Sequence, residues 1–183
     1  MREARAYSKM QFVAAVLIAS LLGWVSVAAP FVASYILRQG HVSPLVLSGA
    51  SSLALAAALV GIPIALVACW AVAGPILWRV MERPVTWCRA ALWGAVIATI
   101  MVVAAVAIAR LNGLRSYFDP TFDFQIGGGD FVQEIDGILT PFGWLLTARD
   151  GLTFVLCGVA IALVIRGIVG PGQVRLGEKT AAE

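Results

Sequence analysis

Charge is missing from four long stretches of this chain, residues 12–37, 45–78, 90–109 and 151–165. Together they hold 95 of the 183 residues, and all 23 charged side chains lie in the remainder. The hydrophobic fraction is 61%, against roughly 45–50% for soluble domains. The hydrocarbon core of a bilayer is about 30 Å thick, and a helix needs about 20 apolar residues to cross it. The missing charge therefore predicts a polytopic membrane protein with the lipid bilayer as its solvent.

The four stretches also lack the residues that carry chemistry. No carboxylate, lysine, arginine or histidine lies in the middle of a stretch. Ion-coupled transporters and proton pumps typically need an ionisable group there, and intramembrane hydrolases need a nucleophile with a base. This argues against an enzyme. The few polar side chains are hydroxyls, which usually bond to helix carbonyls, although a serine-lined path for a small neutral solute is an alternative. They are Ser20, Ser26, Ser34, Ser48, Ser51, Ser52, Thr99 and Thr153.

Histidine and cysteine are scarce. The sequence has a single histidine, His41, which argues against a histidine-based metal site and against a catalytic triad. Three cysteines are an odd number, and none lies in an expected exterior loop, which argues against a disulfide framework. Cys69 and Cys157 lie in apolar stretches, where they behave as small hydrophobic residues, and Cys88 lies in an expected cytoplasmic turn. We expect no metal and no cofactor.

The distribution of basic residues predicts the orientation. Nine of them flank the stretches on one side and four on the other, so the positive-inside rule places both termini in the cytoplasm. The net charge of +3 does not indicate nucleic acid, because the basic residues are spread among short loops and tails. Arginine outnumbers lysine 11 to 2 and alanine is abundant, which favours a GC-rich bacterial genome and hence the bacterial inner membrane. The nine are Arg2, Arg5, Lys9, Arg79, Arg83, Arg89, Arg166, Arg175 and Lys179, and the four are Arg38, Arg110, Arg115 and Arg149.

The expected fold is an all-α, four-helix membrane bundle forming one integral membrane domain over residues 1–183. The first helix is expected to be an uncleaved anchor with a bend at Pro30. The second stretch is too long for one crossing, at about 50 Å, so residues 61–63 or 74–75 should break it. Thr140 followed by Pro141 is typical of an N-cap with proline at the first helical position, which indicates an earlier beginning of the fourth helix near residue 141. The expected transmembrane helices are 12–37, 45–67 with an extension to 78, 90–109 and 148–169, with an exterior loop at 110–147 and a cytoplasmic tail at 170–183.

The exterior loop is the one sizeable segment outside the membrane. Apolar residues recur at helical spacing between Phe131 and Phe142, with Gln133 and Glu134 on the other side, which predicts a short amphipathic helix. The loop is acidic, and a divalent cation is conceivable, but the spacing fits no calcium loop and favours a solvated face. Arg149 and Asp150 are expected to be an interfacial anchor, with a local ion pair as the alternative. The acidic residues are Asp119, Asp123, Asp130, Glu134 and Asp136.

Small residues at four-residue spacing mark three of the helices. Such rows let helices approach closely, so they favour either packing within the bundle or docking of a membrane-protein partner or a second copy. We expect a non-catalytic accessory or interaction protein, and a small transporter or channel for a neutral or lipid-like solute, working at a break near Pro63, is the alternative. The rows are Ala50, Ala54 and Ala58; Ala57, Gly61 and Ala65; Gly94 and Ala98; and Gly158 and Ala162.

Overall fold

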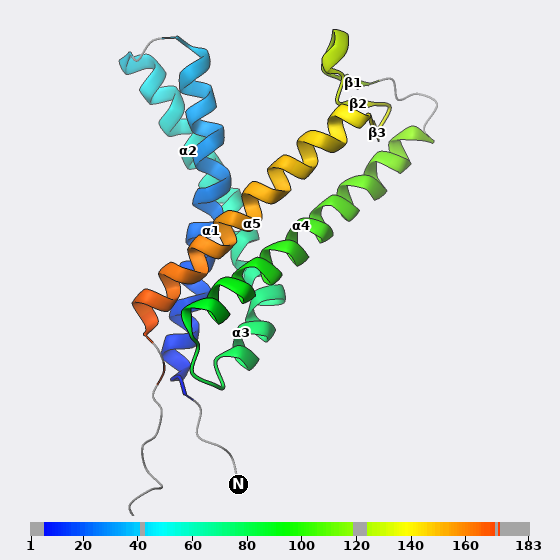
Figure 1. Cartoon of the computed structure of the whole chain (residues 1–183). Helices are drawn as coiled ribbons and strands as arrows, with labels where there is room; N and C mark the ends of the chain where they lie inside the picture. Colours follow the sequence, from blue (N-terminus) through cyan, green and yellow to red (C-terminus); the bar gives the residue numbers. More distant parts are fainter. Residues whose placement is uncertain (1–5, 41–42, 119–123, 171, 173–183) are drawn as a thin grey trace, which may run out of the picture. The chain divides into compact units, whose positions relative to one another are not determined.

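Long helices make up almost all of the protein in its computed structural model (Figure 1). The structure describes residues 6–40, 43–118, 124–170 and 172. Four segments are long and apolar enough to cross a membrane, Lys9–Arg38, Pro44–Val80, Trp87–Tyr117 and Pro141–Val169, which confirms the helical fold class at that level. In chain order the elements are α1 (Lys9–Arg38), α2 (Pro44–Ala68), the π-helix η1 (Cys69–Ala73), α3 (Gly74–Val80), α4 (Trp87–Tyr117), β1 (Gln125–Ile126), the 3-10 helix η2 (Gly129–Phe131), β2 (Glu134–Ile135), β3 (Ile138–Leu139) and α5 (Pro141–Val169).

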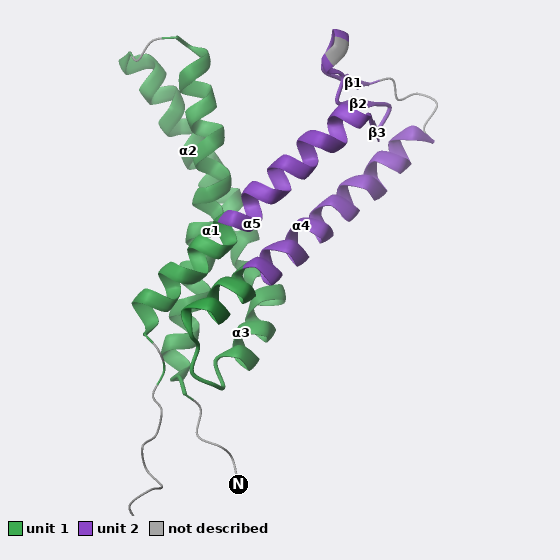
Figure 2. Ribbon diagram, viewed as in Figure 1, with its two compact units in different colours: residues 1–94, 157–183 green, residues 95–156 purple. Residues whose placement is uncertain are grey.

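The chain forms two compact units, coloured separately in Figure 2. Unit 1 comprises Met1–Gly94 and Cys157–Glu183, and unit 2 comprises Ala95–Leu156. Unit 1 therefore holds α1, α2, η1 and α3 together with the beginning of α4 and the end of α5. Unit 2 holds the rest of α4 and α5 with the three strands between them.

Side chains cap the helix beginnings. The Ser8 hydroxyl accepts from the Gln11 backbone N–H at 3.2 Å, and the Gln11 side chain accepts from the Ser8 N–H at 2.8 Å, which is a complete capping box for α1. The Thr140 hydroxyl accepts from the Gly143 N–H at 3.1 Å, and Pro141 is the first residue of α5. The beginning of α5 that Thr140 and Pro141 predict is thus confirmed, seven residues before the expected residue 148.

The second apolar stretch changes helix type near residue 70 and is α-helical through Pro63. The prediction of a break at residues 61–63 is wrong, because α2 runs unbroken to Ala68. The change comes at η1, directly before Gly74 and Pro75, the second place that the sequence indicated. Proline has no N–H, so an α-helix cannot pair Ala71 with residue 75. The π-helix adopts the wider pattern instead, with the Gly74 N–H donating to the Cys69 carbonyl.

The charged residue that ends an apolar stretch coincides with the end of α1 but not with the end of α4. α1 continues through Pro30 to Arg38, and α4 continues eight residues past Ala109, the expected end, to Tyr117. α4 has 31 residues and, at a rise of 1.5 Å per residue, is about 46 Å long. It is therefore longer than the roughly 30 Å thickness of a hydrocarbon core.

The segment between α4 and α5 forms a small antiparallel sheet of order β1-β2-β3. The predicted amphipathic helix between Phe131 and Phe142 is wrong. Asp136 and Gly137 have positive φ values of 49° and 84°, which builds the two-residue turn of a β-hairpin between β2 and β3. A left-handed pair of this kind cannot lie inside an α-helix, so the turn overrides the helical spacing of the apolar residues.

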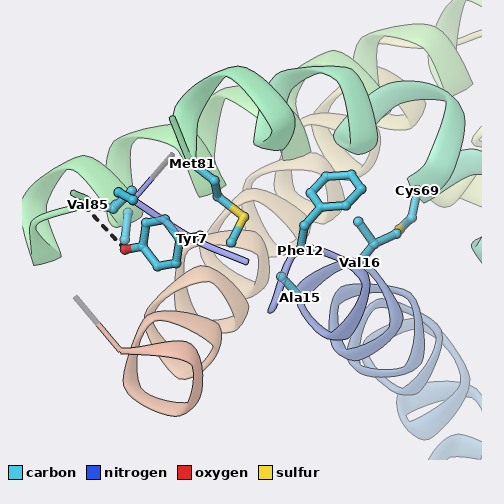
Figure 3. Close-up of a cluster of buried hydrophobic side chains, with 9 residues drawn as sticks. Tyr7, Phe12, Ala15, Val16, Cys69, Met81 and Val85 are labelled. Atoms are coloured by element: carbon cyan, nitrogen blue, oxygen red, sulfur yellow. Dashed lines mark hydrogen bonds between the residues drawn. The ribbon is translucent and has the colours of Figure 1, made fainter. Parts of the chain in front are cut away.

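The most buried part of unit 1 lies around the start of α1 (Figure 3). The Phe12 ring meets Trp70 and Trp78 edge to face, with centroids 5.8 Å and 5.1 Å apart. The buried residues of this cluster come from the N-terminal segment, α1, η1, the turn after α3 and the start of α4. The buried residues are Ala6, Tyr7, Phe12, Ala15, Val16, Cys69, Met81, Val85 and Ala90.

Candidate functional site

A hydrogen-bonded cluster, which we call the terminal clamp, joins three distant segments of unit 1. Tyr7 is buried, and its hydroxyl accepts from the Val85 N–H at 3.3 Å and donates to the Gly170 carbonyl at 3.2 Å. The Gln11 side-chain amide donates to the Val169 carbonyl at 3.2 Å. The start of α1 and the end of α5 are therefore held together at one end of unit 1.

Arg166 completes the terminal clamp. Its Nε donates to the Val85 carbonyl, and its guanidinium carbon lies 5.2 Å from the centroid of the Trp87 ring. Such a cation–π contact contributes about 0.5–2 kcal/mol, depending on exposure. Beside the clamp, a recess of about 10 Å³ is large enough for one water molecule at most. The clamp is therefore a structural fastening between the start of α1, the turn before α4 and the end of α5.

An indole joins α1 to α2 in the middle of their lengths. The Trp24 Nε1 donates to the Ala57 carbonyl at 3.2 Å. A Cβ on Gly61 would lie only 2.7 Å from Cδ1 and Nε1 of Trp24, so the missing side chain at that glycine makes the seat for the ring. Gly61 and Pro63, where the sequence indicated a break, thus lie in a continuous helix against a large aromatic side chain.

Seven of the eight hydroxyls of the apolar stretches bond to carbonyls of their own helices. Ser20 donates to the Val16 carbonyl at 2.8 Å, Ser48 to the Leu45 carbonyl at 2.8 Å and Thr153 to the Arg149 carbonyl at 2.9 Å. The same pattern holds for Ser26, Ser34, Ser51 and Ser52. These contacts are those expected of serine in a transmembrane helix, and they leave the serine-lined path without supporting geometry.

The small-residue rows of α4 and α5 pack against each other in unit 1. A Cβ on Gly94 would lie 2.6 Å from both the Ala162 Cβ and the Gly158 carbonyl oxygen. Glycine lets the two backbones approach closely there. Packing within the chain therefore uses this pair of rows, as it uses the Ala57–Gly61 row on α2.

In unit 2 the segment over residues 124–140, which we call the cap, is fastened to the end of α4. Arg110 pairs with the Glu134 carboxylate at 3.3 Å and donates to the Gly137 carbonyl at 3.4 Å. Gly113 and Gly137 lie backbone against backbone, because a Cβ on either one would collide with the carbonyl of the other. The cap is an ordered structure carried by α4 and α5.

The strand register gives the cap two faces. Cross-strand partners point to the same side of a sheet, so Glu134 and Leu139 share one face and Ile135 and Ile138 the other. Glu134 contacts Arg110 of α4, which marks the inner face. Ile135 and Ile138 are 48% and 41% exposed on the outer face. Phe131 of η2, whose ring meets Phe142 edge to face, is 67% exposed.

The acidic residues of the expected exterior loop have separate fates. Glu134 is paired with Arg110, and the Asp136 carboxylate accepts from the Phe124 N–H at 3.2 Å. Asp119 and Asp123 lie outside the described residues, as does His41. Among the residues that the structure describes, no group of three histidine, cysteine or acidic side chains could hold a metal ion. Cys69 is buried, Cys88 is exposed and Cys157 is half-buried, and all three are free thiols.

Arg149 and Asp150 form the second ion pair of unit 2. The Arg149 Nη2 lies 2.8 Å and its Nε 2.9 Å from one oxygen, Oδ1, of Asp150. The local ion pair weighed as the alternative for these residues is thus present, on an exposed face of α5.

No protein-family model, curated protein or solved structure matches the chain. The candidate functional surface is the outer face of the cap. Its apolar side chains stand on a scaffold fixed by an ion pair, a glycine contact and a helix cap, and this arrangement suits recognition of a partner.

Proposed function

We propose that the protein is a non-catalytic accessory protein of the bacterial inner membrane that binds a membrane-protein partner through the outer face of its cap. One observation carries the proposal. Ile135 and Ile138 are exposed together on the outer face of the sheet, and Phe131 of η2 is exposed as well. Contiguous exposed apolar side chains on a rigid scaffold are typical of an interaction site, because their exposure to water costs free energy that a partner recovers.

The proposed orientation has both termini in the cytoplasm and the cap outside. The terminal clamp supports it, because Tyr7 and Gly170 bond directly and so lie at the same end of unit 1. The excess of basic residues at that side of the apolar stretches supports it as well. A reporter that is active only in the cytoplasm should be active when it is fused after residue 183. A reporter that is active only outside the cytoplasm should be active when it is inserted at residue 128, where an added Cβ meets nothing within 4 Å.

The proposal is tested by purification of the whole chain from mild detergent after crosslinking in the membrane. We expect a stoichiometric partner that is lost from the double variant Ile135→Ser/Ile138→Ser. Ile126→Ser is the matched control, because Ile126 is 40% exposed in the same sheet but pairs with Glu134 on the inner face. Recovery of no second protein, or equal capture by both variants, would refute the proposal.

The alternative, a small transporter for a neutral or lipid-like solute, remains a prediction without a supporting contact. It rested on a break near Pro63, where α2 is continuous. An unchanged flux of every tested solute in Pro63→Ala would remove it.

A further inference from the structure

An exposed apolar stripe in unit 2 surrounds the ion pair of α5. Leu145, Leu152 and Leu156 are 65%, 62% and 61% exposed, and their spacing places them on one side of the helix together with Arg149. The Arg149 and Asp150 side chains are themselves 69% and 66% exposed. Two charges thus lie at the edge of a surface whose other large members are leucines.

The position of the Arg149–Asp150 pair along the helices follows from the packing of α4 against α5. A Cβ on Gly151 would lie 3.1 Å from the Val102 side chain, so these two residues lie level with each other. Arg110 is eight residues beyond Val102, or about 12 Å, and Arg149 is two residues beyond Gly151, or about 3 Å. The pair therefore lies about 9 Å closer to the middle of the helices than Arg110 does.

Apolar surface continues past the pair on both helices. α4 is uncharged from Ala90 to Ala109 and exposes Val103 and Ile108, at 61% and 60%, and α5 exposes Leu145. If the hydrocarbon core reaches the level of Arg110, the pair is embedded in it. A charged side chain in the centre of a membrane helix costs about 2.5–3.5 kcal/mol on insertion scales, so such residues normally have a protein partner. An arginine can extend toward the headgroups, but an aspartate is too short to do so.

The geometry of the pair selects the partner. Both contacts from Arg149 reach Asp150 Oδ1, and in the described part of the chain Oδ2 makes no contact. Successive residues lie 100° apart around a helix, so Arg149 and Asp150 stand on either side of a line that passes over Thr153. Thr153 is small, and its hydroxyl is already bonded to the Arg149 carbonyl, so a second helix can come close there.

We propose that a second copy of this chain covers α5 at this line, so that Arg149 of each copy pairs with Asp150 of the other. Two copies inserted in the same direction are related by a two-fold axis along the membrane normal, which brings equal depths together. A group on one side of the line then faces the group on the other side in the second copy. A cation and an anion flanking the line are therefore self-complementary, and the four charges alternate in a ring. The proposal rests on the proposed role as a membrane-embedded interaction protein, and it names the second copy as one of its partners.

The test is a charge exchange in the full-length chain, read as the mass of the protein in mild detergent and as crosslinked dimer in membranes. We expect the parent chain to be a dimer. Arg149→Asp places four negative charges in the ring and Asp150→Arg places four positive ones, so each alone should be monomeric. The double variant Arg149→Asp/Asp150→Arg restores the alternation and should be dimeric. Arg115→Asp, at an exposed position on α4 of the same unit, is the matched control and should stay dimeric.

Co-expression of the two single variants is the decisive experiment, because it needs no further substitution. The two single variants, carrying different tags, should recover a mixed dimer although neither forms one alone, which also shows that both variants fold. A monomeric parent chain, or dimers in all variants alike, would overturn the proposal. A parent chain that is dimeric but captures no partner through the cap would refute only the function proposed for the cap. Capture of the cap partner by a monomeric parent chain would refute only the dimer.

Discussion

Replacing Gly61 by alanine should break the contact that holds α1 to α2. The new methyl carbon would lie 2.7 Å from Cδ1 and Nε1 of Trp24, so the indole must move. Overpacking of this kind costs about 1–3 kcal/mol. A displaced ring also loses its hydrogen bond to the Ala57 carbonyl, which in a membrane protein contributes about 0.6 kcal/mol and at most about 1.7. Alanine is the better helix former by up to about 1 kcal/mol. The expected net loss is about 1–3 kcal/mol in the free energy of unfolding.

A double-mutant cycle separates the contact from a general effect of the substitution. In the Trp24→Ala background the methyl group has open space, so Gly61→Ala should become neutral or slightly stabilising. The coupling energy between the two positions should then be at least about 1 kcal/mol, as expected for residues in contact. Unfolding is followed by circular dichroism in mixed micelles during titration with a denaturing detergent. Gly23→Ala is the matched control, since nothing lies within 4 Å of a Cβ there. Equal costs of Gly61→Ala in both backgrounds, or a cost no larger than that of the control, would refute the reasoning.

Three further substitutions test the remaining contacts in the same unfolding assay. Gly94→Ala should cost about 1–3 kcal/mol, because its methyl would lie 2.6 Å from atoms of α5, whereas Gly167→Ala, with its nearest neighbour at 3.7 Å, should cost little; similar costs would contradict the predicted packing. Tyr7→Phe removes both hydrogen bonds of the hydroxyl and should cost about 1–3 kcal/mol, with faster hydrogen exchange at the start of α1 and the end of α5. Unchanged exchange would show that the terminal clamp is not what holds those ends. Glu134→Gln weakens a half-buried ion pair with Arg110 at 3.3 Å and should cost less than about 1 kcal/mol, with a smaller difference at high salt; a loss of several kcal/mol would mean that the pair determines the fold of the cap.

The charge pattern of the sequence predicts the number and the cores of the long helices, because absence of charge and helical length are set by the same bilayer thickness. It predicts their ends less well. A charged residue marks where an apolar surface stops, whereas a helix stops where its backbone loses partners. Arg110 therefore ends an uncharged stretch yet lies inside α4, with seven helical residues after it. Where the sequence offers backbone chemistry, as at Thr140 and Pro141, the helix beginning is found to the residue.

The cap and the terminal clamp show two different reasons for failure. The hairpin had a local signal in Asp136 and Gly137, a pair suited to positive φ values, but the helical spacing of Phe131, Ile135 and Ile138 was given more weight. The clamp had no local signal. Tyr7 bonds to residues 78 and 163 positions away, and no pattern within a short window of sequence encodes such contacts.

The terminal clamp also ties folding to the order in which the chain is made. Gly170 is synthesised 163 residues after Tyr7, and at about 5–20 residues per second this interval is about 8–33 s. During that time α1 is already in place while the last acceptor of its tyrosine does not exist. A product whose translation stops before residue 170 can contain most of α5 and still have an unfastened N-terminal segment. The Tyr7 hydroxyl thus distinguishes chains that include residue 170 from chains that stop before it, and we expect membrane proteases that sample loose ends to degrade the shorter chains first.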